Sequence, residues 1–348
     1  MFKPYFTITP KITKDIELIG QVFGYFKVIK LPEGYRKELI SKVTAETVHA
    51  STAIEGNTLT ERQVAEVLQG KKIHAEEQDI NEIVNYNRAL EYIEKRIKNT
   101  KELVISEKLI KEINTLILKD IQDDISGSYR VEQVLVGDYL PPEHFKVSPL
   151  MSEFVQWIKT PQPPSLSPIL YTGITHYQFV AIHPFTDGNG RTTRILTTLM
   201  LALNGYDMTS LFALESYYNR NRKAYYEALN SADKYRTKGE PDLTRWLEYY
   251  VEGMLIEAER AKSRIEALQE KSKAVRDKVW LSDTQTKMLK LTIKQETVKT
   301  ADYLQVSGLS RKGTYNALEK LVQEGLISRK GTNKGAFYTI TEKGLEYR

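Results

Sequence analysis

The stretch "HPFTDGNGRTTR", His183–Arg194, stands directly before a segment whose pattern predicts a helix. Apolar residues continue from it at helical spacing, at Ile195, Leu199 and Leu203. Gly205 can end that helix. Arg191 and Arg194 then lie near its start, where the helix dipole opposes a cation by roughly 0.3 to 1 kcal/mol. We therefore expect an anion beside these two arginines.

The residues before the helix favour a phosphate as that anion. Gly188 and Gly190 allow backbone N–H groups to converge at the helix N-terminus. Arg191 and Arg194 are three residues apart, so their side chains share a face and can hold one anion together. A dinucleotide fingerprint does not fit, because Thr193 stands in place of the third glycine. A surface turn followed by two solvated arginines stays open as an alternative.

His183 and Asp187 add the groups that phosphoryl or nucleotidyl transfer needs. A neutral imidazole can accept the proton of an attacking hydroxyl. A carboxylate four residues later can hold Mg²⁺ against phosphates. A lone histidine is more often structural, but this one stands beside a candidate metal ligand and an anion site. We expect base, metal ligand and phosphate cradle in one loop.

The twelve residues fit the pattern His-x-Phe-x-Asp/Glu-Gly-Asn-Gly-Arg-x-x-Arg at every fixed position, and so resemble the Fic family. Gly190 disfavours the Doc branch, which has lysine there. The resemblance implies a protein adenylyltransferase that moves AMP from ATP to a Ser, Thr or Tyr hydroxyl. It implies His183 as base, Asp187 as Mg²⁺ ligand, Arg194 on the γ-phosphate, and a phosphate-binding segment of Gly188, Asn189, Gly190, Arg191, Thr192 and Thr193.

Two further segments resemble parts of the family that border the nucleotide. "VLVG" resembles the flap that aligns the target by strand pairing, and comprises Val134, Leu135, Val136 and Gly137. "NRNRKAYYEALNSAD" resembles the segment on the adenosine side, which implies contacts from Tyr225, Tyr226 and Asp233. The chain has 21 tyrosines, so packing is the alternative for those two.

Glu55 stands at the predicted C-terminal end of a helix that should stop at Gly56. The helix dipole opposes a carboxylate there, just as it opposes the two arginines. If the two helix ends meet, Glu55 and Arg194 neutralise each other, with Ser51 on the same face as Glu55. "STAIEG" also resembles the family's inhibitory helix motif, which implies that Glu55 takes the place of the γ-phosphate. In some relatives such a glutamate instead helps to remove AMP, and both roles stay open.

The rest of the chain reads as mainly α-helical: a Fic-type helical core with a short β-hairpin flap and a C-terminal winged-helix domain. "YRVEQVLV", residues 129–136, alternates like a strand, and "TPQPPSLSP", residues 160–168, reads as a loop. Near the C-terminus we expect helix, turn and helix over 298–325, with Ser310 as N-cap, and then two short strands. The expected domains are an inhibitory N-terminal region at 1–100, a catalytic core at 101–255, a linker helix at 256–280 and the winged helix at 281–348.

Composition limits the class of protein. The 348 residues carry no cysteine, which excludes thiolate catalysis and cysteine zinc sites. No apolar run approaches the ~20 residues of a membrane span, and no secretory signal is apparent, so we expect a cytoplasmic protein without membrane contact. Residues 281–348 hold 12 Lys/Arg against 7 Asp/Glu, and the remaining residues balance. The C-terminal module is therefore a candidate for an acidic partner.

Several functions stay open at this stage. The main expectation is an ATP- and Mg²⁺-dependent adenylyltransferase, restrained by Glu55, whose target is another protein or the chain itself. The rival is a DNA-binding regulator in which the Fic core senses nucleotide, with Arg311 and Lys312 at the surface that meets DNA. The winged helix can equally serve dimerisation into a homodimer or docking of a target. Some relatives transfer UMP, phosphocholine or phosphate instead of AMP.

Overall fold

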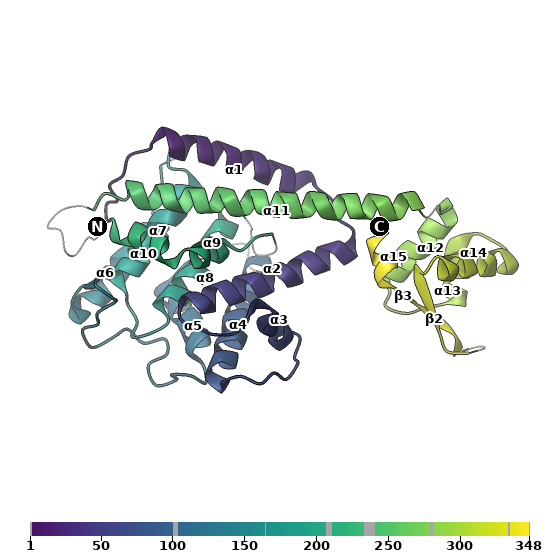
Figure 1. The fold of residues 1–348 in the computed structure, drawn as a ribbon, viewed down its shortest axis with the longest axis horizontal. Helices are drawn as coiled ribbons and strands as arrows, with labels where there is room; N and C mark the ends of the chain where they lie inside the picture. Colours follow the sequence, from purple (N-terminus) through teal and green to yellow (C-terminus); the bar gives the residue numbers. More distant parts are fainter. Residues whose placement is uncertain are drawn as a thin grey trace. The chain divides into compact units, whose positions relative to one another are not determined.

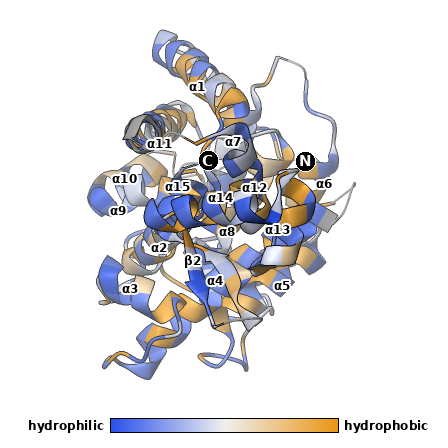
Figure 2. Ribbon diagram, turned by 90° about the vertical axis from the view of Figure 1, so that its right-hand side faces the viewer, coloured by the Kyte–Doolittle hydropathy of each residue, from blue (hydrophilic) through white to orange (hydrophobic). Residues whose placement is uncertain are grey.

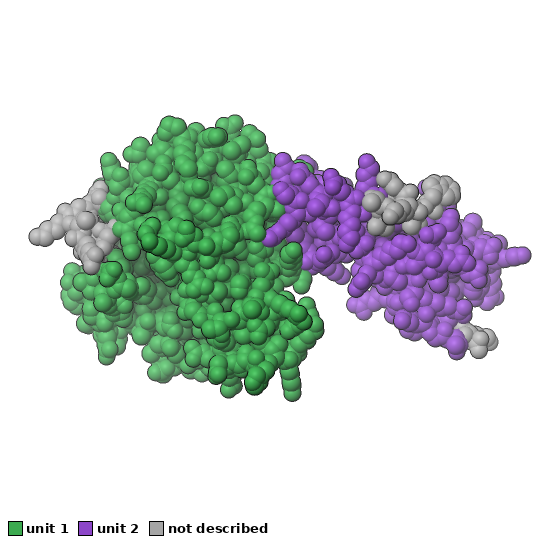
Figure 3. All heavy atoms as spheres, viewed as in Figure 1, with its two compact units in different colours: residues 1–27, 40–261 green, residues 28–39, 262–348 purple. Residues whose placement is uncertain are grey.

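The computed structural model describes residues 2–99, 104–163, 165–206, 211–232, 241–278, 281–332 and 335–347. Over these residues the chain is mainly α-helical, with one small three-stranded sheet (Figure 1). It divides into two compact units, Met1–Lys27 with Ile40–Ala261 and Val28–Leu39 with Lys262–Arg348 (Figure 3). The domain boundaries expected from the sequence stay predictions. Among the described residues no helix is both long enough and apolar enough to cross a bilayer.

Helices α1 to α11 build the first unit, and α2 and α11 each continue into the second. Their bounds are α1 Pro10–Val28, α2 Glu33–Ile54, α3 Glu61–Leu68, α4 Glu77–Asn99, α5 Glu107–Leu118, α6 His144–Lys159, α7 Pro168–Ile182, α8 Asn189–Leu203, α9 Leu214–Arg220, α10 Arg222–Asn230 and α11 Thr244–Lys278. Hydrophilic and hydrophobic residues alternate around most of them, as amphipathic helices require (Figure 2).

Helix α7 is the centre of the first unit. It is buried on nearly every side, and its buried residues include the polar Thr172, Thr175, His176 and Gln178 as well as apolar ones. Ser167 caps its start and Pro168 occupies the first turn, so the predicted loop at 160–168 ends there. α8 follows after a short loop and packs against α7. This pair presents the loop between them, His183–Gly188, as the foundation of the site.

Helix α1 lies along the first half of α11 (Figure 1). Thr9 Oγ1 donates to Glu248 at 2.7 Å, and Lys11 pairs with Glu252 at 2.9 Å. The two helices are more than 200 residues apart in sequence. Contacts between the start and the end of this unit's sequence therefore help to hold the unit together.

The strand predicted over 129–136 is wrong as a regular strand. The structure has two isolated bridges there, Tyr129 with Phe185 and Val136 with Tyr139, the second around a tight turn at Gly137. Leu135 is 68% exposed, so the apolar positions of the alternation bury no face against a core. A two-stranded ribbon without such a face is only marginally stable. The expected flap is a short turn, not a ladder.

The second unit contains α12 Asp283–Lys294, β1 Val298–Lys299, α13 Thr300–Ser307, α14 Arg311–Gln323, β2 Ile327–Lys330, β3 Phe337–Ile340 and α15 Glu342–Glu346. Its strands form an antiparallel sheet in the order β1-β3-β2. The predicted helix pair and two strands are confirmed, and Ser310 caps α14 by accepting from the N–H of Gly313. The two-residue strand β1 was missed because it is too short to alternate.

Candidate active site

The loop between α7 and α8 is held in an uncommon backbone conformation. His183 ends α7 with φ 49°, and Gly188 precedes α8 with φ 76°, a region where glycine has no steric cost. The Asn189 side chain accepts from the N–H of Phe185 at 2.9 Å and donates to its carbonyl at 2.8 Å. The loop is therefore fixed at both ends before any ligand binds.

Two residues that the sequence analysis missed fix this loop from outside. Buried Asn114 of α5 donates to the carbonyl of Asp187 at 3.0 Å. Arg130 donates from Nε to the carbonyl of His183 at 2.8 Å and also bonds the carbonyl of Pro142. Asn114 had a detectable signal, because it is a polar residue in the otherwise apolar buried stripe of α5. Arg130 had none, since its partners are distant backbone atoms.

The start of α8 is shaped to receive an anion. α8 has no side-chain cap, so its first N–H groups are available to a ligand. A Cβ built on Gly190 would collide with Oε1 of Glu55. The carboxylate of Glu55 therefore lies directly against the Cα of Gly190, at the positive end of the helix. An anion from the end of α2 already occupies this cradle.

Arg194 binds the same carboxylate. Its Nη2 donates to Oε1 of Glu55 at 2.8 Å and to the carbonyl of Ser51 at 2.9 Å, and its Nε donates to Oγ of Ser51 at 2.7 Å. The side chain of Arg194 is 1% exposed and that of Glu55 28% exposed. Burial by itself raises the pKa of Glu55, but the charges of Arg194 and Arg191 outweigh it and lower that pKa. The pairing expected from two misplaced helix-end charges is present.

Arg191 is paired with two carboxylates. Nη2 lies 3.3 Å from Oδ1 of Asp187, and Nη1 lies 3.3 Å from Oε1 of Glu82. Glu82 also accepts from Nδ2 of Asn57 at 2.9 Å, two residues after Glu55. Glu82 was missed by sequence reasoning and connects Asn57, just after α2, to Arg191 in the first turn of α8.

His183 has the properties of a base that is neutral at physiological pH. Burial and the positive charge of Arg130 lower its pKa to about 4, against opposing contributions from Glu55 and Asp187. Within the described residues its Nδ1 is buried and has no hydrogen-bond partner. A neutral imidazole can accept a proton from a hydroxyl that reaches it.

A magnesium ion fits this loop only if a substrate supplies further ligands. Within the described chain no three His, Asp or Glu side chains gather to hold a metal alone. The Asp187 side chain is 40% exposed and directly precedes the cradle at Gly188–Gly190. Mg²⁺ is commonly bound by one or two protein carboxylates together with substrate phosphates. The donor set of Asp187 plus phosphate oxygens is consistent with that mode.

The remaining predicted nucleotide residues lie in varied surroundings. The side chains of Thr192 and Thr193 are fully buried, and Thr193 Oγ1 donates to the carbonyl of Asn189 at 2.7 Å. Tyr225 is 2% exposed and its hydroxyl lies 3.0 Å from Nε2 of buried His176, so it is a core residue on this side. Tyr226 is 42% exposed. Asp233 lies outside the described residues. Nucleotide contacts of these residues stay predictions.

Comparison with known proteins finds both a matching family and similar sequences. Residues 104–201 match the model of the Fic/DOC family. The chain is 31% identical over 211 residues to protein adenylyltransferase Fic of Nematostella vectensis, covering 60% of this chain and 48% of that protein. It is 36% identical over 165 residues to the same-named protein of Drosophila mojavensis, covering 46% of this chain and 32% of that one. The chain thus spans between a third and a half of these relatives.

Solved structures share the fold. A Fic family protein from Desulfovibrio desulfuricans superposes with a TM-score of 0.65 at 25% identity, over 98% of both chains. Fic-1 from C. elegans superposes with a TM-score of 0.60 at 24% identity, over 72% of this chain and 71% of that one. The match to the first extends over both compact units, and the second supports the fold alone.

Proposed function

We propose that this chain, which belongs to the Fic/DOC family, is a protein adenylyltransferase that transfers AMP from ATP to a hydroxyl of a target protein. The observation that carries the proposal is the carboxylate of Glu55 in the cradle of Gly190 and Arg194. A site that holds a carboxylate against a helix N-terminus and a buried arginine also suits the terminal phosphate of ATP.

Each group of site residues has its own role in the proposed transfer of AMP. The target hydroxyl oxygen attacks the α-phosphorus, and the bond from that phosphorus to pyrophosphate breaks. His183, neutral because its pKa is about 4, accepts the hydroxyl proton. Gly188, Asn189 and Gly190 hold the phosphates through backbone N–H groups, and Arg191 and Arg194 neutralise their charge. Asp187 would hold Mg²⁺ together with the phosphates, and the ion would supply further charge neutralisation.

Target alignment is assigned to the exposed turn Val134–Gly137. Leu135 is 68% exposed, and Val136 makes only a single bridge to Tyr139. Its backbone therefore has free edge positions with which an extended target segment can pair. Tyr226, which is 42% exposed, is the better candidate of the two tyrosines for an adenosine contact.

Glu55 restrains this activity. Its carboxylate and the γ-phosphate compete for Arg194, so ATP binds poorly or with its α-phosphate misaligned until Glu55 moves. A well-buried pair costs roughly 3 to 5 kcal/mol to break. Even half of that, discounted because Glu55 is partly exposed, corresponds to at least about tenfold in rate. Removal of AMP from a modified target with the help of Glu55 would be a separate activity of the same site.

The test follows label from α-labelled ATP onto protein. Wild type, Glu55→Gly and Glu55→Gly/His183→Ala are incubated with Mg²⁺, with the chain itself as the first target. We expect strong labelling only for the single variant. Glu76→Gly, which removes an exposed glutamate outside the site, should label as wild type does. Label that survives the loss of His183 would remove its role as base.

The second unit favours a second candidate function, binding of double-stranded DNA by a winged helix. The helix pair α13–α14 and the hairpin β2–β3 support that class of fold. Arg311 and Lys312 are exposed at the start of α14, and Arg329 and Lys330 are exposed on β2. Binding to a short duplex should then weaken steeply as salt is raised. Binding that is weak at every salt concentration, or unchanged in Arg311→Gln/Lys312→Gln, would reject this function.

A further inference from the structure

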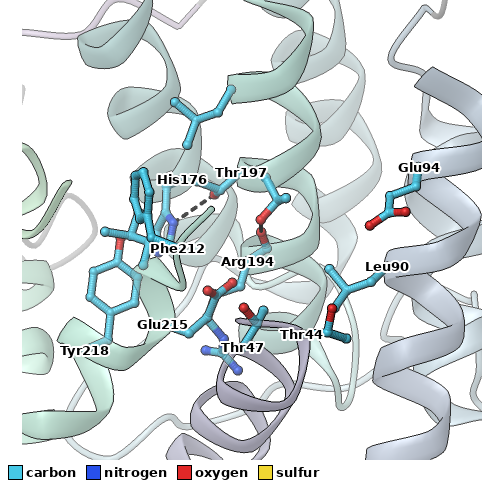
Figure 4. Close-up of a pocket in the computed structure, with 13 residues that line it drawn as sticks. Thr44, Thr47, Leu90, Glu94, His176, Arg194, Thr197, Phe212, Glu215 and Tyr218 are labelled. Atoms are coloured by element: carbon cyan, nitrogen blue, oxygen red, sulfur yellow. Dashed lines mark hydrogen bonds between the residues drawn. The ribbon is translucent and has the colours of Figure 1, made fainter. Parts of the chain in front are cut away.

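A second set of buried polar side chains lies close to Ser51 and Arg194. Arg194 and Glu215, the second residue of α9, line the same buried pocket, which Thr47 of α2 also lines (Figure 4). Tyr86 of α4 donates from its hydroxyl to Oε1 of Glu215 at 3.3 Å. Tyr86 also interacts with the side chain of Ser51, which lowers the pKa of Tyr86 against the larger rise that burial causes. Four helices thus contribute to one connected group of side chains.

The hydrogen bonds in this group run in one direction. Arginine can only donate, and Nε of Arg194 donates to Oγ of Ser51 at 2.7 Å. The hydroxyl of Ser51, having accepted, still has its own hydrogen to donate, and neighbouring Tyr86 donates to Oε1 of Glu215 at 3.3 Å. A carboxylate is the acceptor that such a chain needs at its end. We call Ser51, Tyr86 and Glu215 the rear relay of Arg194.

Every member of the rear relay is withdrawn from water. Ser51 and Tyr86 are 0% exposed, and Glu215 is 4% exposed. A buried carboxylate is costly unless it is hydrogen-bonded and near a positive charge. Burial raises the pKa of Glu215 to about 7, and Arg194 and Tyr86 oppose that rise. The arrangement therefore holds a costly acid in place behind the arginine.

The side chains of Glu55 and Ser51 bind different atoms of the guanidinium, although the Ser51 carbonyl also accepts from Nη2. Glu55 accepts from Nη2, whereas Ser51 Oγ accepts from Nε. Ser51 precedes Glu55 by one helical turn of α2 and is fully buried, while the Glu55 side chain is 28% exposed. Glu55 can therefore turn away while Ser51 keeps its bond to Arg194.

We propose that Tyr86 and Glu215 are positioning residues that hold Arg194 through Ser51, so that its guanidinium stays directed at the cradle when ATP takes the place of Glu55. The inference rests on the proposed function, in which Arg194 binds the γ-phosphate. Loss of the rear relay then weakens the contact to the terminal phosphate specifically. It follows that, when ATP replaces Glu55, the Glu55 side chain moves while α2 keeps its position and Ser51 its bond to Arg194.

The test compares ATP with ADP in the full chain carrying Glu55→Gly. Dissociation constants for both nucleotides are measured by calorimetry at pH 8, where Glu215 is mostly ionised. Adding Tyr86→Phe should weaken ATP binding about five- to tenfold, because the buried hydrogen bond to Glu215 and the interaction with Ser51 are lost. Affinity for ADP, which lacks the γ-phosphate, should stay within about twofold. Glu215→Gln keeps an acceptor but removes the charge, and should lower ATP affinity less.

Tyr171→Phe is the matched control, since the Tyr171 hydroxyl donates to the carbonyl of Ile158 at 2.9 Å and has no part in the relay. It should change neither nucleotide. An equal loss of ATP and ADP in Tyr86→Phe would show a merely structural role, and no loss would show that Arg194 needs no support; both overturn the proposal. If the parent Glu55→Gly fails to bind ATP more tightly than ADP, the assignment of Arg194 to the γ-phosphate fails as well. If Glu55→Gly transfers label, and the added Tyr86 and Glu215 substitutions leave its preference for ATP over ADP unchanged, then only the positioning role is rejected.

Discussion

The starts of α8 and α14 share an unfavourable feature, since each has two basic residues at the positive end of a helix. The surroundings of these residues differ between the two helices. At α14, Ser310 caps the helix with its own side chain, and Arg311 and Lys312 are exposed. At α8 no side chain caps the helix, and Arg191 and Arg194 are 3% and 2% exposed. A helix that caps itself and solvates its cations needs no ligand. One that leaves its N–H groups open and buries its cations has a site for an anion.

The largest expected difference between the two helix starts is in stability. Arg194→Ala removes a buried cation and leaves Glu55 and Ser51 without their partner, which should lower the free energy of unfolding by about 3 kcal/mol. Arg311→Ala removes an exposed side chain and should change it by less than about 0.5 kcal/mol. Urea unfolding monitored by circular dichroism measures both. Equal effects would remove the distinction between the two sites.

Glycine substitutions sharpen the comparison at the level of the ligand. Gly190→Ala places a methyl group where the Glu55 carboxylate lies, and so should weaken nucleotide binding at least about tenfold in the Glu55→Gly background. Gly313→Ala in the first turn of α14 has its nearest neighbour, Leu309, at 3.3 Å and should leave nucleotide binding unchanged. Fluorescent nucleotide titration separates the two. ATP that binds normally to the Gly190 variant would argue against a phosphate cradle there.

The cap itself gives a smaller effect, confined to α14. Ser310→Ala deletes the acceptor for the N–H of Gly313 and should destabilise the second unit by about 1 kcal/mol. Hydrogen exchange of amides in α14 should speed up, while amides of α8 keep their protection. Faster exchange in α8 as well would mean that the two helix starts are not independent.

The smallest expected effect is that of pH. Burial and Arg130 lower the pKa of His183 to about 4, so the base is neutral above that value and becomes protonated only as pH falls through it. The charge of Glu55 raises the pKa of His183. Its removal should therefore lower that pKa further and shift the acid limb of the pH–rate profile to still lower pH. The labelling rate of Glu55→Gly should therefore be independent of His183 ionisation between about pH 5 and 8. An acid limb near pH 6.5 in the labelling rate of Glu55→Gly would instead place this base in an ordinary solvated environment.

What the sequence could predict was local. The helix start at Gly188, the end of α2 at Gly56 and the cap at Ser310 each depend on a few adjacent residues with strong conformational preferences. Their charges then suggested a long-range pair, because two helix-end charges of opposite sign were each unfavourable alone. That pair, Glu55 with Arg194, is present at 2.8 Å.

What the sequence could not predict depends on tertiary contacts. Arg130, Glu82 and Tyr86 act on the loop and the arginines through partners at least several dozen residues away. Nothing in their own neighbourhoods distinguishes them from other surface or packing residues. The strand expected at 129–136 was wrong for the same reason, since alternation describes a strand only when another strand and a core are beside it.

The most direct test of the central claim, that Glu55 takes the place of the terminal phosphate, is the initial rate of AMP transfer measured across ATP concentrations for wild type and Glu55→Gly. We expect the variant to be faster by at least about tenfold at ATP concentrations below saturation, because its site lacks the carboxylate that competes with the γ-phosphate for Arg194. Equal rates for the two proteins at every ATP concentration would contradict the claim.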